Sequence, residues 1–180
     1  MTFDITELQE TQAQLELLAR VDTLTGLANR RQFDERMAQA MSRTRRTLQP
    51  MAVLYLDIDH FKAINDSLGH AVGDAVLCEF ARRLEACVRV TDTVARLAGD
   101  EFVILLEGIA GGAEAGHIAA KVVACIRAPF EVADAPLTVT ASVGVAPYEG
   151  AVQTAAEVLA LADRALYRAK KLGRDRFVLV

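Results

Sequence analysis

The chain has 180 residues, of which 52% are hydrophobic and 24% charged, and its formal net charge is −4. This length fits one domain with a short extension, and the apolar share is enough for a sizeable core. The acidic balance argues against a nucleic-acid binder that works through a basic surface, although a small nucleotide needs only a few local cations. The three cysteines are odd in number and lack metal-binding spacing, so we interpret them as reduced thiols.

The sequence predicts a cytoplasmic domain. It has no apolar run close to the roughly 18 residues of a membrane span. Its N-terminus lacks the basic and then apolar pattern of a signal peptide. We therefore expect no membrane segment in this part of the chain, and a membrane tether elsewhere in a longer protein is compatible with that expectation.

Residues 1–21 predict a connector helix ahead of a domain that spans residues 22–180. Leu8, Leu15 and Leu18 give residues 4–20 a sparse apolar stripe. That stripe is typical either of a solvated helix docked on the domain or of the end of a dimerising coiled coil. Two heptads are too few to decide between these interpretations.

The domain itself alternates apolar runs with amphipathic segments. A polar turn at 22–29 precedes a basic helix up to about residue 46. A strand-turn-strand hairpin in the middle requires antiparallel pairing, so we expect an α+β fold with one central mixed or antiparallel sheet and helices packed around it. The remaining elements are predicted as strands at 51–58, 94–97, 102–106, 137–145 and 176–180, and helices at 61–67, 75–89, 111–128 and 154–172.

Two carboxylate pairs stand at the ends of apolar strands, in Asp57-Ile58-Asp59 and in Asp100-Glu101. If the strands are neighbours, three of these carboxylates converge on one or two divalent cations, which could polarise an α-phosphate and stabilise the attacking and leaving oxygens. The alternative is structural: Asp57 and Asp59 cap the following helix, and Gly99-Asp100 makes a plain hairpin turn.

Residues 61–74 carry groups that suit a nucleotide. Backbone N–H groups at the helix start can hold phosphate oxygens, and Lys62 adds charge. Asn65 and Asp74 offer the amide and carboxylate that match the Watson–Crick edge of guanine. The alternatives are that Asn65 is a turn residue and that Asp74 is the N-cap of a helix that begins at Ala75.

Two basic groups also have a functional and a local interpretation. Lys170 and Arg174 lie at the end of the last helix, where they either form a solvated helix end that favours the dipole or clamp terminal phosphates. Arg89 and Asp92 are three residues apart. They either form a local ion pair of small value or bind a second guanine nucleotide.

Taken together, these segments resemble the GGDEF family, the diguanylate cyclases, from about residue 22 to residue 177. One position departs from the family pattern: Ala98 stands where the family usually has glycine, and the added methyl strains the backbone only if φ is positive there. The matching motifs are Asp22-Thr-Leu-Thr-Gly-Leu-Ala-Asn29-Arg-Arg31, Leu56-Asp-Ile-Asp-His-Phe-Lys62, Asn65-Asp66, Gly69-His70, Gly73-Asp74, Ala98-Gly-Asp-Glu-Phe102, Ser142-Val-Gly144 and Ala162-Asp-Arg-Ala-Leu-Tyr167 through Arg174.

The resemblance implies a fold related to nucleotidyl cyclases and polymerase palms, with a ferredoxin-like core. It implies that a homodimer condenses two GTP into cyclic di-GMP and two pyrophosphates, with Mg²⁺ or Mn²⁺ ions, two per active site. The connector-like helix at residues 4–20 is compatible with a sensory domain upstream in a longer protein, and the acidic charge balance predicts no nucleic-acid partner. A catalytically silent GGDEF domain that acts as a receptor for cyclic di-GMP or GTP is the alternative.

Family likeness also implies roles for individual residues. Asp100 and Glu101 would be catalytic, and Arg89 and Asp92 fall where the family's product-inhibition motif lies. The implied metal ligands are Asp57, Asp100, Glu101 and the backbone of Ile58. The implied substrate-binding residues are Asn65 and Asp74 at the guanine, with Lys62, His60, Phe61, Ala98, Gly99, Lys170 and Arg174 around the rest of the nucleotide.

Overall fold

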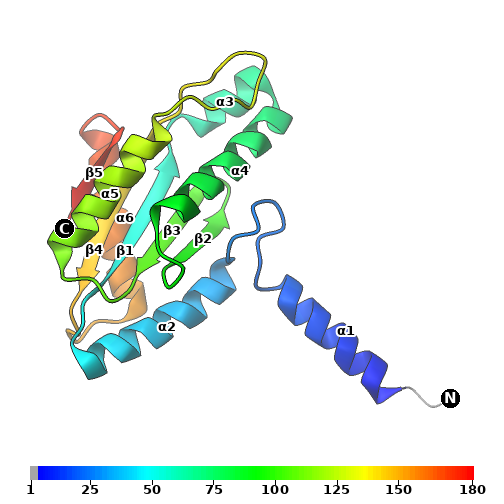
Figure 1. The fold of residues 1–180 in the computed structure, drawn as a ribbon, viewed down its shortest axis with the longest axis vertical. Coiled ribbons are helices and arrows are strands. Elements are labelled where there is room, and N and C mark those ends of the chain that lie inside the picture. Colours follow the sequence, from blue (N-terminus) through cyan, green and yellow to red (C-terminus); the bar gives the residue numbers. More distant parts are fainter. Residues whose placement is uncertain (1–3) are drawn as a thin grey trace.

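The computed structural model describes residues 4–180, apart from the side chains of residues 16–18. A five-stranded sheet in the order β2-β3-β1-β4-β5 forms the centre, with helices on both of its faces (Figure 1). The strands are β1 (Met51–Ile58), β2 (Thr93–Ala98), β3 (Glu101–Leu106), β4 (Ala141–Tyr148) and β5 (Arg176–Leu179). The helices are α1 (Ile5–Leu18), α2 (Arg30–Thr47), α3 (Phe61–Leu68), α4 (His70–Cys87), α5 (Gly112–Ile126) and α6 (Ala155–Lys171).

The predicted α+β class and mixed sheet are confirmed. The central strand β1 pairs antiparallel with both β3 and β4, while β5 runs parallel to β4 at the edge. Because β1 is covered on both faces, it is apolar along almost its whole length rather than alternating. Its even-numbered residues, such as Leu54 and Leu56, pack with α4 and α5, and odd-numbered Val53 and Tyr55 pack with α2 and α6. By the same alternation Asp57 faces the α2–α6 side.

Two predicted boundaries are wrong, each because of a turn. The helix predicted from Ala75 begins at His70, because Gly69 at φ +89° lets the chain turn directly from α3 into α4. Asp74 therefore lies inside α4, and its interpretation as an N-cap is wrong. The strand predicted from Leu137 begins at Ala141, and Leu137 instead exchanges backbone hydrogen bonds of 2.8 and 2.9 Å with Phe130.

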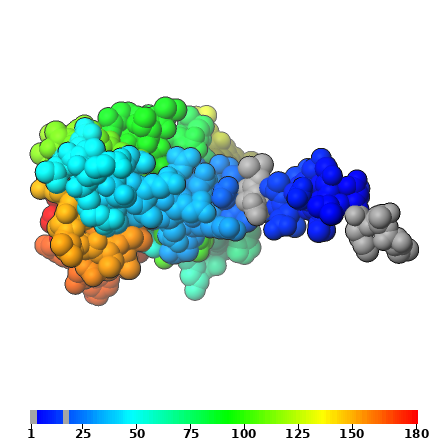
Figure 2. All heavy atoms as spheres, turned by 90° about the horizontal axis from the view of Figure 1, so that it is seen from below, coloured from blue at the N-terminus to red at the C-terminus, as the bar shows by residue number. Residues whose placement is uncertain are grey.

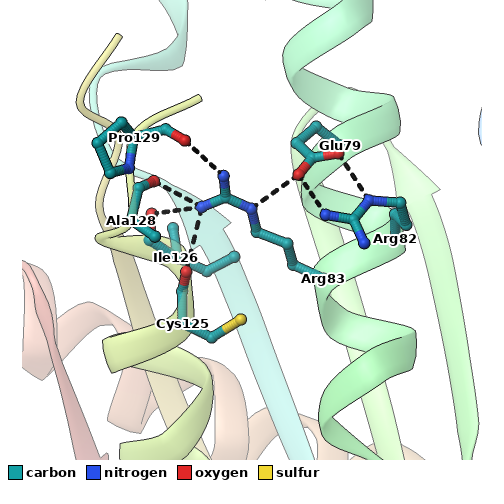
Figure 3. A network of polar contacts seen from close by, with 7 residues as sticks. All are labelled: Glu79, Arg82, Arg83, Cys125, Ile126, Ala128 and Pro129. Carbon is teal, nitrogen blue, oxygen red and sulfur yellow. Dashed lines mark hydrogen bonds and ion pairs between the residues drawn. The ribbon is translucent and has the colours of Figure 1, made fainter. Parts of the chain in front are cut away.

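A buried guanidinium joins α4 to the end of α5 (Figure 3). Arg83 leaves α4 with its side chain only 9% exposed, and Nε donates to Glu79 at 3.0 Å. Its terminal nitrogens supply donors to the last two carbonyls of α5, which have no partner within their own helix, and to two carbonyls just beyond it. The accepting carbonyls, at 2.6 to 3.2 Å, are those of Cys125, Ile126, Ala128 and Pro129.

The first helix stands apart from the sheet. In two perpendicular views α1 extends away from the domain (Figures 1 and 2), so the interpretation that it docks on the domain is wrong. Ile5, Leu8 and Leu15 are 60–71% exposed, while Leu18 lies outside the residues whose side chains are described. Among the helices of residues 4–180, none combines the length and the apolar character that crossing a membrane requires.

Candidate active site

The sheet brings the two predicted carboxylate pairs together. Asp57 on β1 is the register partner of Glu101 on β3, and residues opposite each other in a ladder point to the same face. Asp100 lies in the two-residue turn between β2 and β3, where Gly99 adopts φ +47°. The expectation that these strands are neighbours is confirmed.

Asp57 and Asp100 form a close pair of carboxyl groups with one cation beside them. Lys170, in the last turn of α6, donates to Oδ2 of Asp57. The other oxygen, Oδ1, is buried, and with both carboxylates ionised it has no hydrogen-bond partner among the described residues. Burial raises the pKa of Asp100 to about 7, helped by a hydrogen bond shared with Asp57 and by that group's negative charge. A bound cation would relieve both features.

An open pocket of about 340 Å³ contains this pair. It gathers the end of β1, the start of α3 and the end of α6, so residues far apart in the sequence share one wall. Its lining residues are Asp57, Ile58, Asp59, His60, Phe61, Lys62, Asn65, Asp100, Lys170 and Arg174. The structure thus unites most of the predicted site residues; Asp74, Ala98, Gly99 and Glu101 do not line this pocket.

Glu101 stands beside the pocket rather than in it. Its side chain is exposed, and within residues 4–180 no group of three or more His, Cys, Asp or Glu side chains is arranged to hold a metal ion by itself. The expected convergence of three carboxylates is therefore a convergence of two, with the third facing the same side. Ligation by Glu101 stays a prediction.

The side of the pocket formed by the start of α3 has backbone donors that no side chain caps. His60 adopts φ +58° at the start of α3, and its side chain makes no capping hydrogen bond. The first N–H groups of that helix therefore have no side-chain cap. They lie at the N-terminus of the helix, the end that attracts anions. Arg174 lies beyond α6 at φ +61°, and with Lys62 and Lys170 it surrounds the pocket with positive charge.

Asn65 packs closely against α4 at Gly73, which the sequence offered as part of the Gly73-Asp74 motif. A Cβ placed on Gly73 of α4 would lie 1.7 Å from Oδ1 of Asn65. Glycine in the interior of a helix is unfavourable by itself, so its presence there was the available signal. The missing side chain of Gly73 leaves room for the amide of Asn65 at the pocket wall, and its role at a base stays a prediction.

The helix-capping interpretation of the first acidic pair is wrong. Asp57 binds Lys170, and the buried carboxylate of Asp59 accepts hydrogen bonds from Thr140, Ser142 and the backbone of Asp175. Both side chains therefore bind distant segments instead of the helix that follows them.

The hairpin tip tolerates Ala98. Among the non-glycine residues described, Ala98 is not one of those with positive φ, so the methyl group carries none of the backbone strain that a positive φ would bring. The tip is tied down by Arg96, which donates to the carbonyl of Gly99 at 2.7 Å and to Asp22 at 3.1 Å.

Arg89 and Asp92 form the local ion pair that was one of their two interpretations. Nε of Arg89 lies 3.5 Å from Asp92, whose side chain is 1% exposed. The Asp92 carboxylate also accepts the backbone N–H groups of Arg89 at 2.9 Å and Glu107 at 3.2 Å. A separate pocket of about 360 Å³ adjoins the pair and includes Arg36.

Comparison with known proteins agrees with this geometry. The family model described as "Diguanylate cyclase, GGDEF domain" matches residues 19–176. The bifunctional diguanylate cyclase/cyclic di-GMP phosphodiesterase MucR of Pseudomonas aeruginosa is 42% identical over 172 residues, which are 96% of this chain and 25% of that protein. The diguanylate cyclase TpbB of the same species is 42% identical over 93% of this chain and 39% of its own.

A solved structure extends the likeness to the first helix. The coiled coil and GGDEF domain of DgcB from Caulobacter crescentus, in complex with c-di-GMP, superposes with a TM-score of 0.88 at 27% identity, over 98% of this chain and 93% of that one. The present chain belongs to the GGDEF family of diguanylate cyclase domains. It spans a quarter to about two fifths of the length of the two curated relatives.

Proposed function

We propose that this chain is the catalytic domain of a diguanylate cyclase, which condenses two GTP into cyclic di-GMP and two pyrophosphates. The observation that carries the proposal is the Asp57–Asp100 pair, set in a pocket whose other charged wall is cationic. Paired carboxylates suit a divalent cation, and surrounding lysine and arginine side chains suit the phosphates that such a cation accompanies.

Asp57 and Asp100, with the backbone carbonyl of Ile58, would hold Mg²⁺ or Mn²⁺, and Glu101 would complete a site for two ions. The donor set is all oxygen, which these ions prefer, and the unpartnered Oδ1 of Asp57 gives a ligand atom that the protein itself leaves unsatisfied. When bound, the metal supplies charge stabilisation at the α-phosphate.

The remaining groups bind and orient the nucleotide. Asn65 and Asp74 would read the guanine, while Lys62, the amides near His60 and Phe61, and Arg174 would hold phosphate oxygens. Lys170 neutralises Asp57 in the metal-free domain. We expect its ammonium group to turn to a phosphate oxygen once the metal takes its place, because both partners are anions within reach of one flexible side chain.

Each domain would bind one GTP, so the reaction needs two domains that face each other. Glu101, exposed at the rim, would help to deprotonate the attacking 3′-hydroxyl. The exposed Ile5, Leu8 and Leu15 support a role for α1 as a dimerising connector. We propose that residues 1–21 link the domain, residues 22–180, to a sensory domain, and that the enzyme acts in the cytoplasm.

Product feedback is a further part of the proposal. Arg89 is half exposed and lines the second pocket, where its guanidinium pairs with Asp92 and donates to the carbonyl of Glu107. It would exchange these contacts for a guanine edge or a phosphate. Cyclic di-GMP should inhibit the wild type, and Arg89→Ala should relieve that inhibition without lowering the initial rate. Equal inhibition of both proteins would remove the feedback role.

The principal experiment is product formation from GTP and Mg²⁺ across a series of protein concentrations. The rate should rise with the square of protein concentration while the dimer is scarce, with pyrophosphate released in equal amount to the GTP consumed. Asp100→Ala should lower the rate by about 100-fold or more, as expected when a group that stabilises the transition state is removed. The exposed Asp134→Asn is the matched control, and an Asp100→Ala variant as active as this control would contradict the assignment.

The alternative is a silent domain that binds nucleotide without turnover. The departure from the family pattern at Ala98 is the observation that favours it. Calorimetry separates the two, because a receptor would bind cyclic di-GMP or GTP with unchanged nucleotide recovered afterwards, even at high protein concentration. Release of pyrophosphate by the wild type would exclude the silent receptor.

A further inference from the structure

Asp59 is a buried carboxylate that the proposed chemistry does not use. Only 6% of the residue is exposed. Its Oδ2 accepts the hydroxyl of Thr140 at 2.7 Å and the backbone N–H of Asp175 at 3.0 Å, and its Oδ1 accepts the hydroxyl of Ser142 at 2.7 Å. One side chain therefore joins the end of β1 to the start of β4 and to the loop between α6 and β5.

That loop has an unusual backbone. Gly173, Arg174 and Asp175 follow one another at φ values of +119°, +61° and +49°. Residues with side chains rarely adopt the left-handed region, and two in succession persist only where surrounding contacts hold them. The N–H of Asp175 is one of the two backbone donors of these non-glycine residues, and it points to Asp59. The other, the N–H of Arg174, returns to the carbonyl of Ala169 in α6 at 3.0 Å.

The same turn presents Arg174 to the active-site pocket. The Arg174 side chain is exposed yet lines the pocket beside Asp100 and Lys170. An exposed arginine has many rotamers, so its direction depends on where its backbone is anchored. We propose that Asp59 is a positioning residue, which fixes the left-handed turn and thereby aims Arg174 at the terminal phosphates of the nucleotide.

A carboxylate suits this task better than an amide. Three donors converge on Asp59, two of them on a single oxygen. Asparagine has one acceptor oxygen for Thr140 and Asp175, and its NH₂ group can donate to the hydroxyl of Ser142, so the contacts it keeps would be neutral rather than charge-assisted. Asp59→Asn should therefore weaken the hydrogen bond from the N–H of Asp175, which loses its ionised acceptor, with almost no change of side-chain volume.

The inference rests on the proposed function, and the test separates the two. The probes are 3′-deoxy-GTP, which lacks the attacking hydroxyl and cannot condense, and GMP, both titrated with Mg²⁺ in a calorimeter. Asp59→Asn should weaken binding of the triphosphate by about tenfold, the change expected when one hydrogen bond loses its charge assistance. Binding of GMP should change by less than about twofold, within the uncertainty of such comparisons.

Two further variants tell positioning from general destabilisation. Arg174→Ala should give the same triphosphate-specific loss, and the double variant should be no weaker than either single one, because both changes remove one interaction. Ser142→Ala removes a hydrogen bond of Asp59 without touching Asp175. It should lower the melting temperature while leaving the ratio of triphosphate to monophosphate affinity unchanged.

Several results would overturn the role of Asp59: equal weakening of both probes, losses that multiply in the double variant, or normal triphosphate binding in Asp59→Asn. If Asp59→Asn does not fold, Arg127→Ala replaces it, since Arg127 holds the side chain and carbonyl of Asp175 from the solvent side at 2.8 and 3.2 Å. Arg127→Ala should weaken binding of the triphosphate but not of GMP, and unchanged triphosphate binding would count against the proposal. Failure of the wild type to bind either probe would instead contradict the proposed function.

Discussion

At the residue scale, Asp57 and Asp100 make the folded domain sensitive to pH. The pKa of Asp100 rises from an ordinary value of 3.8 to about 7, first because the group is buried and then because Asp57 lies against it. Between these values the folded state keeps a proton that the unfolded state has released. The contribution of this group to stability is therefore complete below about pH 3.8 and falls as the pH rises to about 7.

Replacement of Asp100 by asparagine should therefore stabilise the metal-free domain while it removes activity. We expect Asp100→Asn to raise the melting temperature by about 2–4 °C at pH 8, the shift that corresponds to about 1 kcal/mol in a domain of this size. Below pH 3.8 the difference should vanish. Calorimetric melting in the presence of a chelator measures both limits, and a difference that is independent of pH would show that charge is not the cause.

At the element scale, the close packing of α6 on β4 determines how near Lys170 lies to Asp57. A Cβ on Gly144 would lie 2.0 Å from the carbonyl oxygen of Ala162 and 2.2 Å from the amide nitrogen of Leu166. Both are backbone atoms of α6 and cannot turn aside. Because Gly144 has no side chain, α6 can pack this closely on β4, and this packing places Lys170 in the last turn of the helix.

Gly144→Ala should lower the free energy of unfolding by about 2–3 kcal/mol, since overpacking against backbone forces the helix to shift. Gly116→Ala is the matched control. Its added methyl would meet the ring of Phe177 at an ordinary 3.6 Å, and alanine is favoured over glycine inside α5 by up to about 1 kcal/mol. Urea denaturation compares the two, and similar losses would mean that contact with α6 is not the reason.

The hydrogen bonds of Arg83 predict that substitutions of two adjacent arginines, Arg83 and Arg82, differ in their effect on stability. Arg83 is buried, stacks 3.9 Å from the centre of the Phe130 ring and supplies the end of α5 with donors. Arg83→Met should therefore lower the free energy of unfolding by about 3 kcal/mol, the loss typical when a buried ion pair is broken. The preceding residue, Arg82, is 68% exposed and binds only Glu79 among the described residues. Arg82→Met should therefore change the free energy of unfolding little. Denaturant midpoints would show the contrast, and equal shifts would contradict it.

Secondary structure was predicted best from the sequence where a whole segment is buried. Buried β1 is apolar throughout, and its predicted range agrees with the observed one. The start of α4 was missed because Gly69, which permits a left-handed turn between two helices, has the same local pattern as a helix stop. The role of Asp59 could not be predicted, because it depends on Thr140, Ser142 and Asp175, which only the folded sheet brings to it.

At the scale of the whole molecule, a series of contacts runs from the turn after α1 to the tip of the β2–β3 hairpin. The turn after α1 places Asp22 against Arg96, and Arg96 also holds the carbonyl of Gly99, next to Asp100. Burial opposes ionisation of Asp22, but hydrogen bonds from Thr25 and the charge of Arg96 lower its pKa overall. A movement of the exposed helix would therefore reach the hairpin tip beside Asp100, and it would also reach the start of α2 through the hydrogen bond from Asn29 to the carbonyl of Ala19.

The order of the strands also has a consequence for how fast the domain forms. The central strand finds its partners far along the chain, with Ala52 opposite Leu106 and Met51 opposite Tyr148. Such distant pairings slow the search for the native state, so refolding should take milliseconds to seconds rather than microseconds. In stopped-flow refolding, tyrosine fluorescence and recovery of triphosphate binding should rise together, because neither half of the chain can assemble the pocket before the other arrives.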